Sequence, residues 1–299
     1  MKPVEFLLIE NPTPVKDIFP DSVFAQLAAA KISDVLDREV TVEDEVVQDE
    51  LDQVKEFLVF TPTDEKAVSL GGVGYFRNLE KLMLESHLIE ALPEELGTLT
   101  NLSILVLTSN RIKSIPSWIG NLTQLTRLHL DSQTPDSESI PGLSGEVPES
   151  IGRLTKLEHL ALHNNLGLTG KLPESLVQLT ALQGLPIQTN AFEDLTVLNR
   201  ISPSVVVNAI NQALGKVDLG VVAADSVLQV KLPVIFVQAQ TEGDVLYDQR
   251  GIEINHPDAL IGEDHLYVDL PTNQTGDQEV TLQFASNIKT SITYTYKVE

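Results

Sequence analysis

The sequence contains no cysteine, and this absence excludes several kinds of chemistry at once. Disulfide bonds, a thiol nucleophile and a cysteine-ligated zinc site all require this residue. The chain is also poor in positive charge, because 20 lysine and arginine residues stand against 43 acidic ones and leave a net charge of −23. The acidic residues are spread along the whole chain, so no segment offers the basic surface that binds phosphate backbones. Binding to nucleic acid or to anionic membranes is therefore not expected.

A long apolar segment is missing as well. The sequence has no run of about 18 apolar residues, so we expect no membrane-spanning helix. The stretch Leu7-Leu8-Ile9 behind Lys2 is too short for a signal peptide. These observations alone leave two interpretations open: either the protein is cytosolic, or the sequence is a mature or shortened form.

One pattern occurs five times between about residues 79 and 195. Leucine or isoleucine occupies the first, fourth and sixth positions of each copy, and the copies are Leu79–Leu84, Leu102–Leu107, Leu125–Leu130, Leu157–Leu162 and Leu182–Ile187. A period of about 23 to 25 residues with this spacing is typical of leucine-rich repeats. The fourth copy begins late, which indicates an insertion of about nine residues near Ser132 to Ser144.

The spacing predicts how each repeat folds. The leucines alternate as in a strand, so they point into a shared core while the intervening residues point onto one concave face of a parallel sheet. Asparagine three residues after the last leucine satisfies backbone groups of the turn. Because His87 and Gln133 replace it in two repeats, we expect an imperfect asparagine ladder there. After each strand a proline predicts the start of a short helical turn on the convex side, at Pro93, Pro116, Pro148 and Pro173.

The residues before the repeats predict a helical cap. Ile18-Phe19-Pro20-Asp21 precedes an apolar-rich helix, and Thr41 followed by Asp44 predicts the start of a second, short helix. With Leu51-Asp52-Gln53-Val54 and the segment from Leu70-x-Gly72-Val73 to Asn78-Leu79, these motifs are similar to the internalin cap and its entry into the repeats. The chain therefore resembles the internalins, a family of bacterial surface proteins.

The pattern changes again after the repeats. Ser202-Pro203 predicts a helix that ends near Leu214-Gly215. From Val217 onward, short alternating stretches separated by turn residues predict a β-sandwich. The internalin resemblance implies that this sandwich is immunoglobulin-like.

The predicted fold class is thus an α/β leucine-rich-repeat solenoid with an N-terminal α-helical cap, followed by an all-β immunoglobulin-like sandwich. The predicted parts are a leader or linker (1–17), the helical cap (18–70), the repeats (71–200), a connector or C-terminal cap (201–216) and the sandwich (217–299).

The concave face carries the candidate ligand-binding residues. They are Lys81, Met83, Glu85, Ile104, Val106, Thr108, Arg127, His129, Asp131, His159 and His163. Strands about 4.8 Å apart would place Asp131 beside His163 and Arg127 beside His159. Met83, Ile104 and Val106 are expected to form an exposed apolar patch that suits a partner protein.

Two interpretations of the polar residues are considered. His129, Asp131 and His163 are either a metal or acid-base site, or part of a polar binding surface with an ion pair. We favour the binding surface, because a catalytic centre needs a cleft. The insertion with Asp136 and Glu138 is either a recognition loop or a tolerated excursion. The acidic residues of the last part are read as a solvated surface rather than a calcium site, and they are Asp244, Asp248, Asp258, Glu263, Asp264 and Asp269.

The expected function follows from the solenoid and from the resemblance. We expect a non-enzymatic protein-binding or adhesion module of a secreted or cell-surface bacterial protein, with a protein ligand from a host or a cell surface. No cofactor, metal or catalytic residue is expected. The alternatives are a glycan- or cell-wall-binding protein that uses its acidic C-terminal part and, less favoured, a metal-dependent hydrolase at the histidines.

Overall fold

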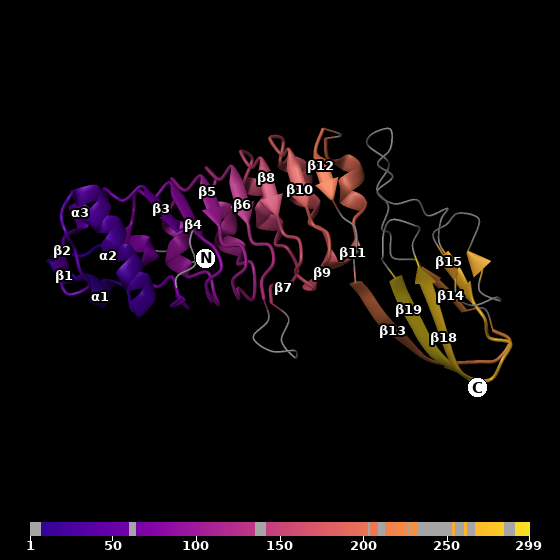
Figure 1. Cartoon of the computed structure of the whole chain (residues 1–299). Coiled ribbons are helices and arrows are strands. Elements are labelled where there is room, and N and C mark those ends of the chain that lie inside the picture. Colours follow the sequence, from indigo (N-terminus) through magenta and orange to yellow (C-terminus); the bar gives the residue numbers. More distant parts are fainter. Residues whose placement is uncertain are drawn as a thin grey trace.

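The protein is an elongated solenoid of repeats, with helices at its N-terminal end and further strands after its C-terminal end (Figure 1). The computed structural model describes residues 7–59, 64–134, 142–202, 204–208, 213–226, 228–231, 253–254, 260–261, 267–283 and 291–299. Among these residues, no helix combines the length and the apolar character that a membrane crossing requires.

The N-terminal end contains three helices and two short strands. They are β1 (Thr13–Pro14), α1 (Val15–Ile18), α2 (Ser22–Leu36), β2 (Glu45–Val46) and α3 (Gln48–Leu51). The helix expected after Asp21 is confirmed as α2, and the Asp21 carboxylate accepts a hydrogen bond of 2.8 Å from the N–H of Phe24 at its start. The helix expected from Thr41 is wrong. The Asp44 carboxylate accepts from the N–H and the hydroxyl of Thr41, which closes a turn instead.

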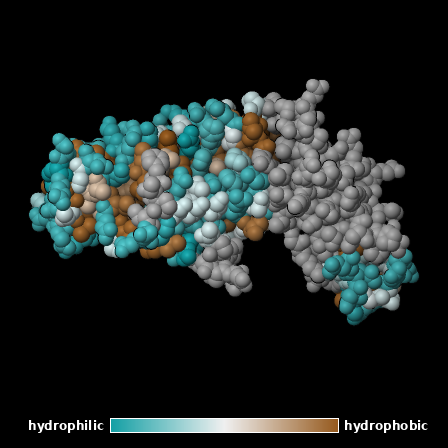
Figure 2. Space-filling view, in the orientation of Figure 1, coloured by the Kyte–Doolittle hydropathy of each residue, from teal (hydrophilic) through white to brown (hydrophobic). Residues whose placement is uncertain are grey.

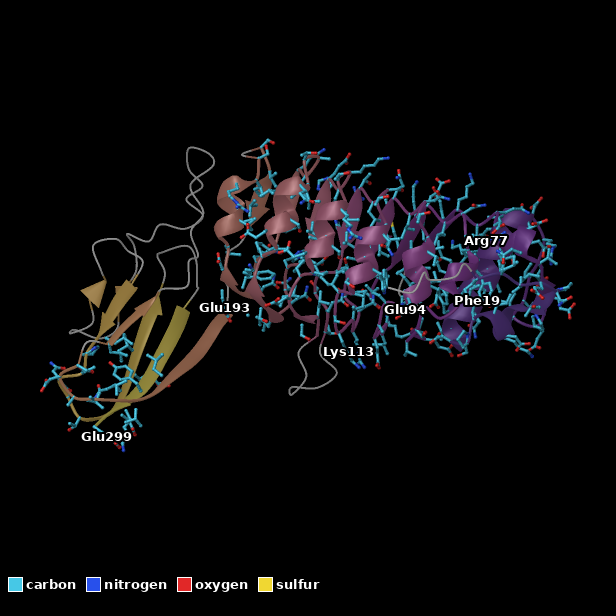
Figure 3. The ribbon with its side chains drawn as sticks, turned by 180° about the vertical axis from the view of Figure 1, so that it is seen from behind. Phe19, Arg77, Glu94, Lys113, Glu193 and Glu299 are labelled. Atoms are coloured by element: carbon cyan, nitrogen blue, oxygen red, sulfur yellow. The ribbon has the colours of Figure 1, made fainter. Side chains whose placement is uncertain are left out.

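Four phenylalanine rings join these helices to the repeats. Phe19 stacks on Phe76 with ring centroids 5.1 Å apart, and Phe24 of α2 lies 5.2 Å from Phe57 of strand β3. All four rings are buried, and Phe19 is labelled at this end of the molecule in Figure 3. The N-terminal helices and the first repeats therefore share one apolar core.

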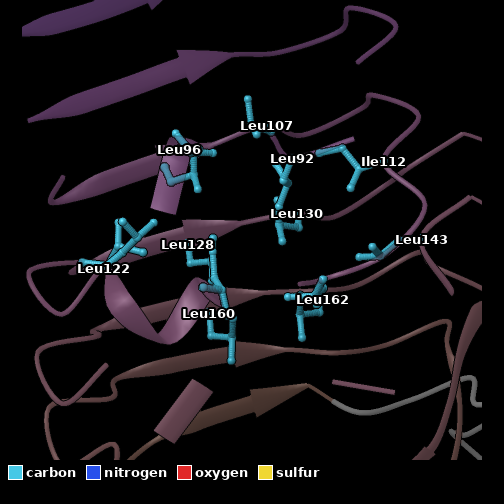
Figure 4. Packing of buried hydrophobic residues seen from close by; sticks show 14 of the residues in the cluster. Leu92, Leu96, Leu107, Ile112, Leu122, Leu128, Leu130, Leu143, Leu160 and Leu162 are labelled. Carbon is cyan, nitrogen blue, oxygen red and sulfur yellow. The ribbon is translucent and has the colours of Figure 1, made fainter. Parts of the chain in front are cut away.

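Seven parallel strands form the main sheet. In chain order they are β3 (Glu56–Val59), β4 (Lys81–Leu84), β5 (Ile104–Val106), β6 (Arg127–His129), β8 (His159–Ala161), β10 (Gly184–Pro186) and β12 (Val206–Asn208). The five predicted strands are confirmed, and β3 and β12 extend the sheet at its two ends. Leucines of successive repeats stack behind the sheet, as Leu128 and Leu160 do in Figure 4.

The helix expected from Ser202-Pro203 is wrong. Residues 206–208 form β12, in which Val206 lies opposite Gly184 of β10, and β13 (Ala213–Val222) covers the predicted helix end. The β-branched run Val205-Val206-Val207 explains the difference, because such side chains suit a strand better than a helix.

Short 3-10 turns form the side of the core opposite the sheet. They are η1 (Val73–Tyr75), η2 (Glu94–Thr98), η3 (Ser117–Asn121), η4 (Glu149–Arg153), η5 (Glu174–Gln178) and η6 (Thr196–Arg200). Four of them follow the predicted prolines directly, so that expectation is confirmed. A Cβ added to Gly97 would lie 2.9 Å from the Trp118 ring, and one added to Gly120 would lie 2.4 Å from the carbonyl oxygen of Ser150. Glycine at these positions therefore allows neighbouring repeats to approach closely.

The amide ladder is more regular than the sequence predicts. Asn110 accepts from the N–H of Ile89 and donates to the carbonyl oxygens of Leu84 and Leu107. Gln133 makes equivalent bonds, since its Oε1 accepts from the N–H of Ile112 at 3.0 Å and its Nε2 donates to Leu107 at 2.8 Å. The expected interruption at Gln133 is therefore wrong, because glutamine offers the same amide group as asparagine.

The remaining strands form smaller sheets. β7 (Ser144–Gly145), β9 (Gly167–Lys171) and β11 (Ala191–Asp194) make a parallel sheet on another side of the solenoid. After β13 the C-terminal strands are β14 (Leu228–Lys231), β15 (Glu253–Ile254), β16 (Leu260–Ile261), β17 (Tyr267–Leu270), β18 (Gly276–Gln283) and β19 (Ser291–Val298). They form two sheets, ordered β13-β19-β18-β15 and β14-β17-β16. The Tyr296 hydroxyl of β19 donates to the carbonyl of Pro271, next to β17, at 2.7 Å.

Candidate ligand-binding face

The candidate binding surface is the outer side of the seven-stranded sheet. This sheet face consists of three rows of side chains that cross the strands. The first row is Glu56, Lys81, Ile104, Arg127, His159 and Gly184; the middle row is Leu58, Met83, Val106, His129, Ala161 and Pro186; the third is Glu85, Thr108, Asp131, His163 and Gln188. Figure 2 shows that hydrophilic residues prevail on the solenoid surface seen there, with hydrophobic residues in separate groups.

The middle row is less accessible than the sequence indicates. Met83 and His129 are half-buried, whereas Val106 between them is only 2% exposed. Val106 was expected to be exposed, and this expectation is wrong, because its short side chain lies between two longer ones on the adjacent strands. Of the three residues in the predicted apolar patch, Met83 and Ile104 therefore remain accessible to a partner.

The charge and polarity of the side chains in the first row change along the sheet. At its N-terminal end Lys81 and Glu56 form a salt bridge of 2.7 Å, and the half-buried Ile104 follows. Arg127 then pairs in register with His159, as the repeat spacing predicts. The His159 ring lies over Gly184, since a Cβ added there would lie 2.9 Å from its Nδ1.

Asp131 is the most buried charged residue of the sheet face, with 5% exposure. Its carboxylate accepts a hydrogen bond of 3.1 Å from the Thr108 hydroxyl and lies 3.5 Å from Nε2 of His163. The expected neighbourhood of Asp131 and His163 is thus confirmed. A buried carboxylate with such partners is held in one orientation.

Three histidines gather at the centre of the sheet face. His129 of β6 lies in register with Ala161 of β8, and His159 and His163 stand two positions to either side of Ala161. Burial is the main cause that lowers the pKa of His129, and the neighbouring Arg127 and the other two histidines lower it further, while Asp131 raises it. His129 is therefore neutral at pH 7.

The metal interpretation of this cluster gains no support. Within the described part of the chain, no group of three or more histidine, aspartate or glutamate side chains has the arrangement that holds a metal ion. The loop residues Asp136 and Glu138 lie outside the described residues, as do Asp244, Asp248, Asp258, Glu263 and Asp264.

The sequence interpretation missed the two outer strands of the face. Glu56 and Leu58 of β3 and Val206 of β12 belong to it, and Val206 is 74% exposed. The signal for β3 is present, because Val54-x-x-Phe57-x-Val59 has the spacing of the leucine pattern with other apolar residues in place of leucine.

Comparisons with known proteins agree with this fold. The family model for a leucine-rich repeat region matches residues 57–206, which is half of the chain. Internalin C2 of Listeria monocytogenes is 25% identical, with a TM-score of 0.54 over 72% of this chain and 90% of that one. A secreted internalin-like protein of the same species is 15% identical, with a TM-score of 0.60 over 98% of this chain and 100% of that one, and shows the same fold. None of the curated proteins compared with this chain matches it significantly.

The protein belongs to the leucine-rich repeat proteins. Within that class it is internalin-like, as its similarity to internalin C2 and to the internalin-like folds shows.

Proposed function

We propose that the protein is a non-enzymatic binding module of a secreted or cell-surface bacterial protein, and that it binds a protein ligand through the sheet face. The observation that carries this proposal is the composition of that face. Half-buried apolar side chains such as Met83 and Ile104 lie beside a charged group that includes Arg127. An apolar centre with charged neighbours is the arrangement that protein interfaces favour.

The sheet face is also well preorganised for binding. The side chains of its first two rows stand on strands that are hydrogen-bonded to their neighbours in a parallel ladder. Behind the strands, the leucines of the core are almost fully buried. A partner that binds such a surface orders few additional groups, so little of the binding free energy is lost to conformational entropy.

The parts at the two ends suit structural roles in this proposal. The N-terminal helices would cap the solenoid, because Phe19 after α1 and Phe24 of α2 pack against Phe57 of β3 and Phe76 at the entry to the first repeat. The two C-terminal sheets would form an immunoglobulin-like sandwich that serves as a spacer. Secretion or surface display is supported by the likeness to a protein described as a secreted internalin-like protein.

The test is binding by the whole chain and by two matched charge reversals. A partner captured from cell-surface proteins would be bound to the parent chain, to Arg127→Glu on the sheet face and to Arg153→Glu in η4 on the opposite side. We expect Arg127→Glu to weaken binding by about 30-fold or more, which corresponds to the about 2 kcal/mol of a hot-spot contribution, and Arg153→Glu to bind as the parent does. Thermal melts of both variants check folding. Equal losses for the two variants, or none for Arg127→Glu, would place the ligand elsewhere.

A further inference from the structure

We propose that a groove beside α2, at the N-terminal end of the solenoid, binds a basic amphipathic helix of a second protein partner (Figure 1). The groove lies among the N-terminal helices and not on the sheet face. This inference therefore goes beyond the proposed function and does not depend on it.

The groove has a volume of about 490 Å³ and two walls. One wall is a side of α2, on which residues three or four positions apart lie together, and the other is the segment that follows the helix. Ala29 and Val40 are 4% and 5% exposed and form the floor, whereas Ala30 and Thr41 are exposed at the rim. The full lining is Gln26, Ala29, Ala30, Ser33 and Asp34 of α2, and Val40, Thr41 and Val42 of the segment. The groove thus has an apolar floor and is open to solvent at its rim.

Hydrogen bonds hold the two walls together. The Ser33 hydroxyl accepts from the N–H of Val40 and donates to the carbonyl oxygen of Ala29, both at 2.9 Å. The carbonyl oxygen of Val42 accepts from the N–H of Lys16 at 3.0 Å. The shape of the groove is therefore fixed before a partner binds, so binding orders few additional groups of this chain.

The small side chains of the α2 wall suit a partner helix. Helix axes pack about 8–10 Å apart, and the side chains at the contact set this distance. Ala29, Ala30 and Ser33 are all small, so a second helix can approach α2 closely. The wall extends from Gln26 to Asp34, which corresponds to about 12 Å along the helix axis, or about two turns. A partner helix that presents apolar side chains over about two turns would fill the groove.

The charges around the groove favour a positively charged partner. The described lining residues include Asp34 and no lysine or arginine. Residues 34–45, which contain the turn between the two walls, include six acidic residues and one arginine. Three of these acidic residues are exposed and form no ion pair with a described residue, and they are Asp37, Glu39 and Glu45. The rim therefore offers carboxylates that a basic partner can approach.

The cations near the groove are already paired with carboxylates of the chain. These ion pairs are Lys16–Glu43, Lys31–Asp34 and Arg38–Glu50. The net charge of −23 also attracts a basic segment from a distance, while the groove supplies the surface for contact. An apolar floor with an acidic rim matches a helix that has apolar residues on one face and lysine or arginine beside it.

The experiment uses the full chain and a labelled amphipathic peptide of about 15 residues, with leucine and alanine along one face and lysine on the others. One control peptide has the same residues in scrambled order, and another has glutamate in place of every lysine. Affinities are measured by fluorescence polarisation at about 0.15 M salt. We expect the amphipathic peptide to bind about tenfold or more tightly than either control, because the scrambled peptide keeps the charge but lacks the apolar face.

Matched variants of the chain locate the peptide. Ala30→Leu fills the rim of the groove and should weaken binding by about tenfold or more, whereas Ala91→Leu, at an exposed alanine of the repeats, should not. Asp34→Asn removes one carboxylate of the rim and should weaken binding by about two- to fivefold. Its control is Asp225→Asn, at an exposed aspartate after β13, which should bind as the parent does. Thermal melts check that all variants are folded.

Similar affinities of the amphipathic and scrambled peptides would overturn the inference, because charge alone would then explain binding. Equal losses in Ala30→Leu and Ala91→Leu, or no loss in Asp34→Asn, would do the same. Sedimentation of the chain without peptide tests a different occupant. We expect Ala30→Leu to leave the oligomeric state unchanged, and a dimer that this variant abolishes would assign the groove to a second copy of the chain instead.

Discussion

His87 accepts a hydrogen bond of 3.1 Å at its Nδ1 from the backbone N–H of Ala67, in the place that Asn110 takes one repeat later. The ring is 2% exposed, and its Nε2 is buried with no hydrogen-bond partner among the described residues. An imidazole that accepts at Nδ1 carries its proton at Nε2, so this histidine is neutral. Burial, with a smaller effect from Lys66, lowers its pKa from the usual 6.5.

We predict that His87 makes the protein sensitive to acid. Its pKa is lower in the folded than in the unfolded chain, so the unfolded chain binds the proton more tightly. The stabilisation is complete above about pH 6.5, decreases as the pH falls below that value, and stops changing below the folded pKa. Denaturant melts between about pH 7.5 and pH 5 should show this loss. In His87→Asn, which keeps an acceptor without a titrating group, the slope should be smaller.

His129 also has a lowered pKa, so it too contributes a loss of folding stability as the pH falls. The comparison is therefore made in a His129→Gln background, where His87 is the titrating group under test. A pH dependence that stays the same after His87→Asn in that background would contradict the prediction.

The two sides of the main sheet predict different losses of stability for two apolar residues. Leu107 is fully buried in the core, so Leu107→Ala should lower the free energy of unfolding by about 2–5 kcal/mol. Met83 stands half-buried on the sheet face, and Met83→Ala should cost about 1 kcal/mol or less. Urea melts of the two variants measure the difference. Similar losses in both would mean that the sheet face is itself part of a covered interface.

Gly97 and Trp118 are predicted to be energetically coupled. Gly97→Ala would press a methyl group against the Trp118 ring and should destabilise the protein by about 1–3 kcal/mol. In a Trp118→Ala background the same change should cost less, because the obstructing ring is gone. Gly120→Ala is the control in a Ser150→Ala background, where the obstructing atom is a backbone carbonyl oxygen that remains. If Ser150→Ala reduced the cost of Gly120→Ala, or if Trp118→Ala did not reduce the cost of Gly97→Ala, the repeats would have to rearrange.

Phe19 is predicted to connect the N-terminal helices to the solenoid. Phe19→Ala removes a ring that is 1% exposed and in contact with Phe24 and Phe76, so the cost should be about 3–5 kcal/mol. Leu8→Ala at 54% exposure is the control and should change stability by about 0.5 kcal/mol or less. Calorimetry would also show whether the helices melt with the repeats. A separate, earlier transition in the parent protein would contradict the shared core.

The leucine spacing is sufficient to predict the register of the sheet face. It places Arg127 against His159 and Asp131 near His163 correctly, because each strand position follows from a count along the chain. The exposure of a side chain cannot be predicted from such a count. The burial of Val106 depends on the lengths of its neighbours Met83 and His129, which a single repeat does not contain.

The starts and ends of helices and strands outside the repeats are harder to predict, because the same local motif can form either of two structures. Thr41 and Asp44 match a helix start but close a turn, and Ser202-Pro203 precedes a strand in which Val206 pairs with Gly184. In both places long-range pairing overrides local preference. β3 was missed for another reason, because Phe57 takes a leucine position in the apolar pattern.

The longest repeat contains an insertion that does not disturb the main sheet. Gln133 and Gly142 lie on either side of the insertion and next to each other, since a Cβ added to Gly142 would lie 2.1 Å from the Gln133 carbonyl oxygen. β6 nevertheless pairs directly with β8, so the insertion leaves the strand register intact. Because the two attachment points are adjacent, the segment between them is free to vary in length and sequence at little cost in stability. This junction is therefore a suitable site for grafting foreign peptides while the scaffold stays unaltered.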